Sequence, residues 1–300
     1  MDNIFNVPGH MKTKMTRLAI FLASITLLSA CASKSVSDDK KTIFVSITPL
    51  KAIIEELTYG DFTVEVLVPQ GSSPESYDPT ARQLTEASDA QLLFTTGLIT
   101  FEQNLVDRIA HKERLINLSE GIELLAGCCT HNHKHSHHKH GIDPHIWTSP
   151  RALGTMIGTM HRSIKNLYPD STKYDKAATR LLEQVVELDA RCKASLEAAQ
   201  VDGFMIYHPA YTYYANDYGI RQIAIEQDGK EPSPRQLTTL VQEARAEGIK
   251  SILIQPQYNI EKVMPIAKEC GAEVVVTDPL AANIFGEIAR VTEIICRSNE

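Results

Sequence analysis

From residue 42 onward, short apolar runs alternate with segments whose apolar residues recur at helical spacing. Runs such as "TIFVSI", "FTVEVLV" and "LLFTTG" have the length of buried strands, and amphipathic stretches such as "PLKAIIEELT" and "FEQNLVDRIAH" lie between and after them. The same alternation returns after residue 200 in "GFMIYH", "RQIAIE", "SILIQP" and "EVVVTD". Strands that alternate with helices are typical of mainly parallel sheets flanked by helices. The pattern therefore predicts an α/β protein with two lobes, residues 42–167 and 201–300.

A long helix is predicted between these lobes, over residues 168–200. Asp170 or Ser171 is available as its N-cap, and neither Gly nor Pro interrupts the segment before Gly203. An unbroken helix of this length reaches about 40 Å or more. Its apolar residues keep a helical spacing, so we expect one side of it to pack along both lobes: Leu181, Leu182, Val185, Val186 and Leu188. A rigid helix in this position implies a cleft between the lobes and limited hinge motion of one lobe relative to the other.

Residues 1–30 have the features of a secretory signal peptide. Basic Lys12, Lys14 and Arg17 precede the apolar run "LAIFLASITLL", which is too short to span a bilayer as a mature helix. The following "LSAC" resembles a bacterial lipobox, in which Cys31 is lipidated and becomes the new N-terminus. Met11 is an alternative start to Met1, and a soluble secreted protein with an unmodified Cys31 is the alternative interpretation.

Residues 31–41 are small, polar and charged, and we expect them to form a lipidated, flexible tether. The folded part is then periplasmic or at the cell surface, anchored to a bacterial membrane through lipid. Removal of residues 1–30, which carry a net charge of +2, changes the formal net charge of the chain from −7 to −9. An acidic protein of this kind argues against nucleic acid as a partner.

Five cysteines remain besides Cys31, so at least one is free or pairs between chains. An extracytoplasmic compartment permits disulfides, and Cys270 and Cys296 are near enough to the C-terminus to be a candidate pair. The adjacent Cys128 and Cys129 would form a strained bond with each other. Free thiols or metal contacts are the alternatives at those two positions.

Four polar residues lie at places where a ligand site is expected, three of them after apolar runs and one after a His-rich stretch. In open α/β sheets, ligands bind beyond the carboxyl ends of the strands. Glu75 lies in "QGSSPESYDPT" after one run, and His145 lies in "DPHIW" after a His-rich stretch. His208 follows "GFMIY", and Asp278 follows "EVVVT". Each lobe thus offers two candidate ligands, separated by 70 residues in both cases.

Each residue also has an ordinary explanation when it is considered singly. Glu75 would be a solvated carboxylate, His145 a packed histidine beside Trp147, His208 a histidine packed among tyrosines, and Asp278 a helix N-cap. Considered together, two imidazoles and two carboxylates across a cleft can enclose a divalent transition metal. Zinc takes four such ligands at about 2.0–2.2 Å, and four protein ligands leave no position for an activated water. The set therefore predicts metal carrying and no enzyme activity.

Asp143 and the Tyr-rich stretch after His208 are expected to supply hydrogen bonds that fix the orientation of the two imidazole rings. Both lie within a few residues of the histidines that they would hold. The metal site would then depend on more residues than its four candidate ligands.

The motifs together resemble one known family. The lipobox, "LVPQGSSPESYDPT", "DPHIW", "YHPAYTYYANDYG", "EPSPRQL" and "VVTDPL" occur in the order found in the metal-binding lipoproteins of zinc and manganese ABC importers, the ZnuA/TroA-like solute-binding proteins. The resemblance extends from about residue 42 to the end. It implies two α/β lobes joined by a rigid helix, a metal held between them, and delivery to a membrane permease whose transport is powered by a separate ATPase. A monomer is expected.

The resemblance also implies roles for individual residues. His145 and His208 match the metal histidines of the family, and Asp278 matches a carboxylate that some members use. Glu75 departs from the pattern, because zinc carriers usually have a histidine there. Either Glu75 replaces that histidine as a ligand, or water does.

The identity of the metal has evidence on both sides. Two histidines and two carboxylates have the make-up of the manganese carriers of the family, and oxygen ligands suit manganese or iron. Dense histidines, as in the predicted loop 128–141, are typical of the zinc carriers. We therefore predict Zn²⁺, with Mn²⁺ or iron as the alternative. The histidines of this loop are His131, His133, His135, His137, His138 and His140.

We expect the His-rich loop to be mobile, because it has no apolar face. Its functional interpretation is a low-affinity collector or sensor of metal, and the alternative is a dispensable solvated loop.

Two other classes of function remain as alternatives. A metal-dependent hydrolase would use Glu75 or Asp278 as a general base, but the sequence contains neither an HExxH run nor a GxSxG elbow. An adhesin would bind host matrix independently of His145 and His208.

Overall fold

The computed structural model describes residues 41–127, 141–226 and 229–297. The chain divides into two compact units, residues 1–40 and 41–300, and every described residue belongs to the second unit. The predicted signal peptide, Cys31 and the six histidines of residues 131–140 lie outside the described residues. In the part that is described, no helix has the length and apolar character required to cross a membrane.

The first lobe is built on a four-stranded sheet in which every strand pair is parallel. The strand order is β2-β1-β3-β4, with β1 (Thr42–Val45), β2 (Thr63–Val66), β3 (Leu92–Thr95) and β4 (Leu115–Asn117). The connections carry α2 (Thr48–Leu57), α3 (Ala81–Asp89), α4 (Thr100–Arg108) and the short 3-10 helix η1 (Lys112–Arg114). All four residues of β3 are buried, as expected for a central strand that helices cover on both faces.

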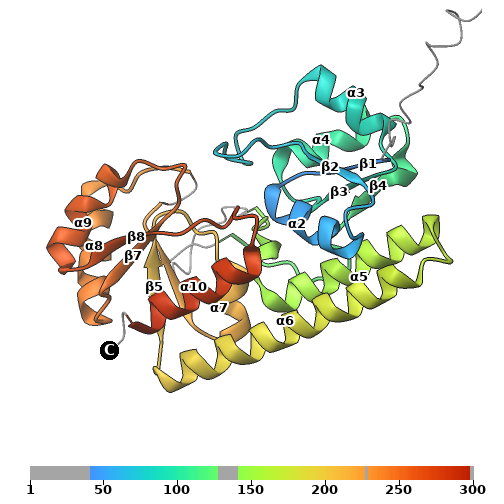
Figure 1. Cartoon of the computed structure of the whole chain (residues 1–300). Coiled ribbons are helices and arrows are strands. Elements are labelled where there is room, and N and C mark those ends of the chain that lie inside the picture. Colours follow the sequence, from blue (N-terminus) through green and yellow to red (C-terminus); the bar gives the residue numbers. More distant parts are fainter. Residues whose placement is uncertain (1–40, 128–140, 227–228, 298–300) are drawn as a thin grey trace, which may run out of the picture. The chain divides into compact units, whose positions relative to one another are not determined.

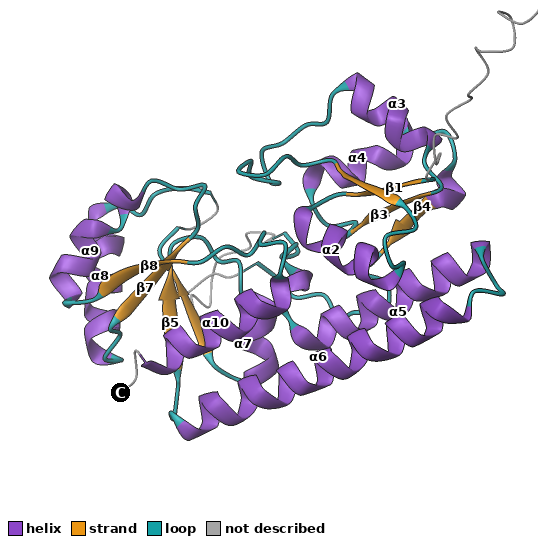
Figure 2. Cartoon of the chain, in the orientation of Figure 1, coloured by secondary structure: helices purple, strands orange, loops and turns teal. Residues whose placement is uncertain are grey.

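The second lobe repeats this topology. Its sheet has the order β6-β5-β7-β8, again parallel throughout, with β5 (Gly203–Ile206), β6 (Arg221–Ala224), β7 (Ser251–Ile254) and β8 (Glu273–Val276). Its helices are α7 (Thr212–Tyr218), α8 (Pro234–Ala246), η3 (Ile260–Lys262), α9 (Met264–Cys270) and α10 (Ile284–Arg297). Figure 2 shows the two groups of strands separately, each with its own helices. The predicted fold class, two lobes with parallel sheets flanked by helices, is confirmed.

Two long helices connect the lobes. After η2 (Ile146–Thr148), α5 (Pro150–Leu167) leads through a short turn into α6 (Thr172–Ala198), which has 27 residues and is therefore about 40 Å long. Figure 1 shows α6 lying along α5 and continuing past it toward the second sheet. Near its start, Tyr174 donates a hydrogen bond to Asp61 of the first lobe (2.7 Å), and farther on Asp189 accepts one from Tyr218 of the second lobe (3.0 Å). The predicted helix therefore contacts both lobes.

The buried side of α6 is narrower than the sequence analysis predicts. Leu181, Val185 and Leu188 are buried, whereas Leu182 and Val186 are 36% and 69% exposed. The prediction is wrong for these two residues because neighbours in a helix point about 100° apart, so each of the adjacent pairs 181–182 and 185–186 presents only one side chain to the core.

One hydrophobic core runs through most of the described chain. It includes strands of both lobes and the buried sides of α5, α6 and α10. A smaller core lies on the other side of the second sheet, where α8 and α9 cover residues such as Ile223 and Ile252. Trp147, Tyr211 and Tyr214 are among the largest fully buried side chains of the larger core.

The candidate pairing of Cys270 with Cys296 is absent, because Cys270 is a free thiol. Cys270 is the last residue of α9, whereas Cys296 lies in α10 and packs against the larger core. Cys192 is also free and is buried in α6.

Two substitutions on α6 test the arrangement of its faces. Leu181→Ala removes a fully buried side chain, and we expect it to lower the free energy of unfolding by about 2–5 kcal/mol. Val186→Ala changes an exposed position, and we expect an effect within about 0.5 kcal/mol. Urea unfolding of both variants measures the difference, and equal effects would contradict this orientation of the helix.

Candidate metal centre

His145 is held by the segment that leads into α5. Asp143 Oδ1 accepts hydrogen bonds from both the backbone N–H of His145 (2.8 Å) and its ring Nδ1 (2.9 Å). Thr148 donates to the His145 carbonyl at 2.8 Å, and Ser149 caps α5 by accepting from Ala152 N. Because a carboxylate only accepts, the Nδ1 of His145 carries the proton and its Nε2 faces the space between the lobes.

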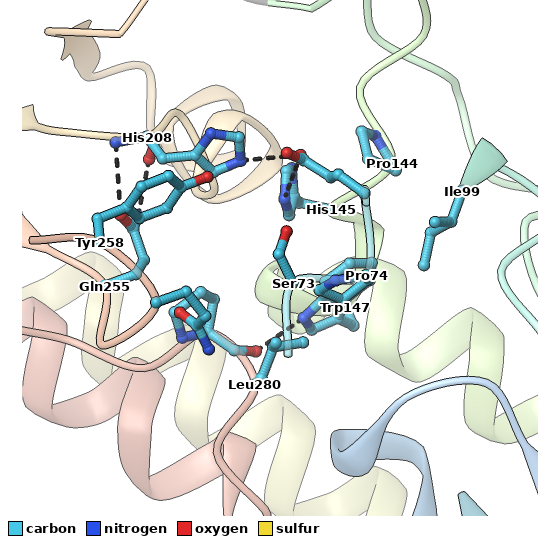
Figure 3. A pocket seen from close by; sticks show the side chains of 13 residues that line it. Ser73, Pro74, Ile99, Pro144, His145, Trp147, His208, Gln255, Tyr258 and Leu280 are labelled. Atoms are coloured by element: carbon cyan, nitrogen blue, oxygen red, sulfur yellow. Dashed lines mark hydrogen bonds and ion pairs between the residues drawn. The ribbon is translucent and has the colours of Figure 1, made fainter. Parts of the chain in front are cut away.

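His208 follows β5 and is fixed in the same way from the second lobe. Its Nδ1 lies 2.9 Å from Glu226 Oε2. The side chain of Gln255 contacts the His208 backbone on both sides, since its Nε2 donates to the carbonyl (2.7 Å) and its Oε1 accepts from the N–H (3.4 Å). Tyr258 stacks on the imidazole, with ring centroids 5.4 Å apart and planes inclined at 24°. Figure 3 shows Tyr258 and Gln255 beside His208.

Glu75 completes the group from the loop between β2 and α3. Its Oε1 lies 2.9 Å from His208 Nε2 and 3.6 Å from His145 Nε2. One ligand atom from each of the three residues lies within 4.8 Å of the other two. The histidines are largely buried, but the Glu75 side chain is 39% exposed. The structure thus brings together three of the four predicted ligands.

The charges of the group are mutually stabilised. Burial raises the pKa of Glu75, but its hydrogen bond to His208 and its attraction to both imidazoles outweigh burial and keep that pKa below its ordinary value. Burial alone would lower the pKa of His208, yet hydrogen bonds to Glu226 and Glu75 raise it to about 9. Burial also opposes ionisation of Asp143, and the contacts with His145 reverse this and lower its pKa.

Asp278 lies outside this group. Its Oδ1 accepts a hydrogen bond from Leu280 N (3.0 Å), and its backbone N–H donates to Glu287 (2.7 Å). It lines a different, neighbouring cavity, together with Ile47 and Gly71. The next residue, Pro279, accepts a hydrogen bond from Trp147 Nε1 at 2.8 Å. This bond joins the lobes beside His145, whose ring centroid lies 5.2 Å from that of Trp147. A ligand role for Asp278 stays a prediction.

The cavity at the three residues is small. It measures about 30 Å³, enough for an ion with one or two waters, and its wall away from the ligands is largely apolar, with Ile99, Trp147 and Leu280. Two imidazole nitrogens and one carboxylate oxygen are donors that suit zinc and related divalent ions. With three protein donors, a tetrahedral ion has one position left.

Two residues that hold His208 are absent from the sequence prediction. Glu226 comes shortly after β6, and Gln255 directly follows β7. Both end apolar runs, "RQIAIE" and "SILIQP", and so follow the same rule that selects His208 and Asp278. Tyr258 carries no comparable signal, because its stacking depends on a loop geometry that no local pattern specifies.

Comparison with known proteins decides the family. The model of the ZnuA family, described as "Zinc-uptake complex component A periplasmic", matches residues 43–287. The chain belongs to this family. The resemblance recognised in the sequence motifs is thereby confirmed.

Individual relatives of the ZnuA family are similar over most of the chain. The zinc-binding lipoprotein AdcA of Streptococcus pneumoniae strain R6 is 27% identical over 278 residues, which cover 89% of this chain and 56% of that protein. The chain therefore spans about half the length of the AdcA relatives that it matches. The high-affinity zinc uptake system protein ZnuA of Bacillus subtilis is 24% identical over 289 residues, 90% of both chains.

Solved structures show the same fold. A crystal structure of ZnuA has 30% sequence identity and a TM-score of 0.78, with 87% of this chain and 100% of that chain covered. A ZnuA deletion mutant with zinc bound has 29% identity and the same TM-score, with 87% and 99% covered.

Proposed function

We propose that this protein captures a divalent transition metal ion, Zn²⁺, between its lobes and delivers it to an ABC permease. The observation that carries the proposal is the convergence of His145 Nε2, His208 Nε2 and a Glu75 oxygen within 4.8 Å of one another. Membership of a zinc-uptake family and a related structure with zinc bound support the same metal. The function is binding and transfer, without a catalysed reaction.

The arrangement gives each ligand a distinct task. His145 and His208 come from opposite lobes, so an ion bound by both joins the lobes. Their Nδ1 atoms are held by Asp143 and Glu226, so the Nε2 atom of each ring is the one that can bind the metal. His208 must first lose the Nε2 proton that it shares with Glu75. Glu75 supplies a negative charge and is the most exposed of the three, so it lies at the solvent side of the site.

Two donors are candidates for the fourth coordination position, Asp278 and water. Asp278 would have to leave its hydrogen bond from Leu280 N to reach the ion, whereas water needs no rearrangement. Asp278→Ala separates them, because zinc affinity falls sharply only if the carboxylate is a ligand.

Manganese is the second candidate ion. The observation in its favour is Glu75, which puts a carboxylate in the cluster where zinc carriers of this family usually have a histidine. Direct competition between Zn²⁺ and Mn²⁺ decides between them.

We also propose that Cys31 is lipidated after cleavage of residues 1–30 and that the protein works at the outer face of a bacterial membrane, beside its permease and the ATPase that powers transport. A periplasmic family description and a lipoprotein relative support this location.

The first prediction from this proposal concerns the histidines. We expect His145→Ala and His208→Ala each to abolish tight binding of one zinc ion per chain, while deletion of residues 131–140 preserves it. His161→Ala is a matched control, because His161 pairs with Asp175 on the helices α5 and α6 (2.8 Å) and lies outside the site. Metal analysis by mass spectrometry measures the stoichiometry. Tight binding in both site variants would refute the assignment.

The second prediction concerns selectivity. Glu75→His gives a set of three nitrogen ligands, so we expect it to raise the preference for Zn²⁺ over Mn²⁺. Glu75→Gln keeps the shape but removes the charge, and we expect it to weaken binding of both ions by at least about tenfold. Competition with a chromophoric chelator measures the affinities. An unchanged zinc-to-manganese ratio in Glu75→His would show that residue 75 does not contact the ion.

The third prediction concerns the anchor. Because one modified cysteine would hold the protein at the membrane, we expect Cys31→Ser to move it from the membrane fraction to the soluble fraction of the expressing bacterium. Cys270→Ser is the matched control and should remain with the membrane. Membrane association of Cys31→Ser would contradict lipidation at this residue.

A further inference from the structure

The hydroxyl group of Thr212 connects the two lobes immediately behind the candidate metal centre. Thr212 is the first residue of α7 and lies four positions after His208. Its Oγ1 donates a hydrogen bond to Asp143 Oδ2 at 2.7 Å, and it accepts one from Gln222 Nε2 at 3.0 Å. A residue of the second lobe thus contacts the carboxylate that holds the histidine of the first lobe.

Asp143 uses both carboxylate oxygens, and the two have different tasks. Oδ1 accepts from the backbone and the ring of His145, and Oδ2 accepts from Thr212. The side chain is 3% exposed. Leaving a buried carboxylate oxygen without a donor costs free energy. The hydrogen bonds to both oxygens therefore fix the orientation of the carboxylate plane. Without the Thr212 hydroxyl, the plane can turn, and the imidazole bound to Oδ1 turns with it.

Gln222 determines the direction in which the Thr212 proton points. The Gln222 Oε1 accepts from the backbone N–H of Tyr211 at 2.8 Å, which places the amide nitrogen toward Thr212. Because that nitrogen is a donor, the hydroxyl must accept from it and donate its single proton elsewhere. The acceptor of this hydrogen bond is Asp143 Oδ2. Donation therefore runs from Gln222 to Thr212 to Asp143 Oδ2, and Asp143 Oδ1 accepts from His145 on the other side.

The neighbouring Tyr213 reinforces the same connection through the backbone. Its hydroxyl donates to the Asp143 carbonyl at 2.9 Å and accepts from Leu125 N at 3.2 Å. The position of the Asp143 backbone is therefore secured independently of Thr212. What Thr212 alone adds is the orientation of the carboxylate.

We propose that Thr212 is a positioning residue for metal binding, which orients His145 across the lobe interface by directing the Asp143 carboxylate. This inference rests on the proposed function, because it takes His145 to be a metal ligand. Thr212 lies four residues after His208 in the second lobe, so its hydrogen bond to Asp143 links the segment that carries His208 to the carboxylate that holds His145. The orientation of the His145 ring then depends in part on this hydroxyl group.

The experiment compares Thr212→Val with Thr212→Ser in the full mature chain, and the probe is Zn²⁺ in competition with a chromophoric chelator. Valine keeps the shape and removes the hydroxyl, so we expect zinc affinity to fall about tenfold, in the range typical of groups that orient metal ligands. Serine keeps the hydroxyl and should bind within about twofold of the wild type. Thr238→Val is a matched control, because Thr238 is exposed on α8 and donates only to Pro234 of its own helix.

A double-mutant cycle with Asp143→Ala distinguishes positioning from a general structural effect. If Thr212 acts through Asp143, Thr212→Val has no further effect on zinc affinity once the carboxylate has been removed. Additive losses would overturn the proposal, as would a serine variant that binds as weakly as the valine variant. If Thr212→Val fails to fold, as judged by its unfolding midpoint, Thr212→Ala replaces it in the same cycle.

His145→Ala, measured in parallel, separates this inference from the proposed function. Wild-type affinity of Thr212→Val beside a loss in His145→Ala would overturn the role of Thr212 alone. Tight zinc binding by His145→Ala would overturn the site itself.

Discussion

The candidate metal centre depends on two hydrogen bonds between a buried carboxylate and an imidazole, Asp143 with His145 and Glu226 with His208, each 2.9 Å long. Each bond determines which ring nitrogen carries a proton and in which direction the other nitrogen points. The remaining contacts serve these two pairs. Gln255 fixes the backbone of one histidine, Thr148 fixes that of the other, and Thr212 directs the carboxylate of Asp143.

The repeated topology explains why such pairs can form at this place. In a parallel sheet, all strands point the same way, so the residues that follow them gather at one edge. His208, Glu226 and Gln255 follow three strands of the second sheet and meet there. The first lobe contributes in a different way. Glu75 comes from the long loop after β2, and His145 comes from the segment before α5, so the histidine of this lobe is supported by the helices that join the lobes.

The periodicity of the sequence was sufficient to predict the alternating strands and helices, the two sheets and the long helix. Polar residues after apolar runs also indicated Glu75 and His208, because residues that follow parallel strands share an edge, whereas His145 was selected by its place after the His-rich stretch. The periodicity did not distinguish Leu181 from Leu182, since both fit a helical spacing and only the packing partner decides which one is buried. The position of Asp278, turned toward Leu280 N, follows from a local hydrogen bond that competes with any metal. The contact of Thr212 with Asp143 joins residues 69 positions apart and has no counterpart in any sequence pattern.

The larger hydrophobic core has a consequence for how the molecule unfolds. It continues from the first sheet through α5 and α6 to α10, although α10 is the last helix of the second lobe. The lobes are therefore units of topology rather than independent units of cooperative unfolding, because separating them would expose the apolar side of α10. The smaller core beneath α8 and α9 is the part that can open locally while the rest stays folded. Hydrogen exchange by sub-global opening would accordingly be fastest at the backbone amides of α8 and α9. The amides of the larger core would exchange only when the whole protein unfolds.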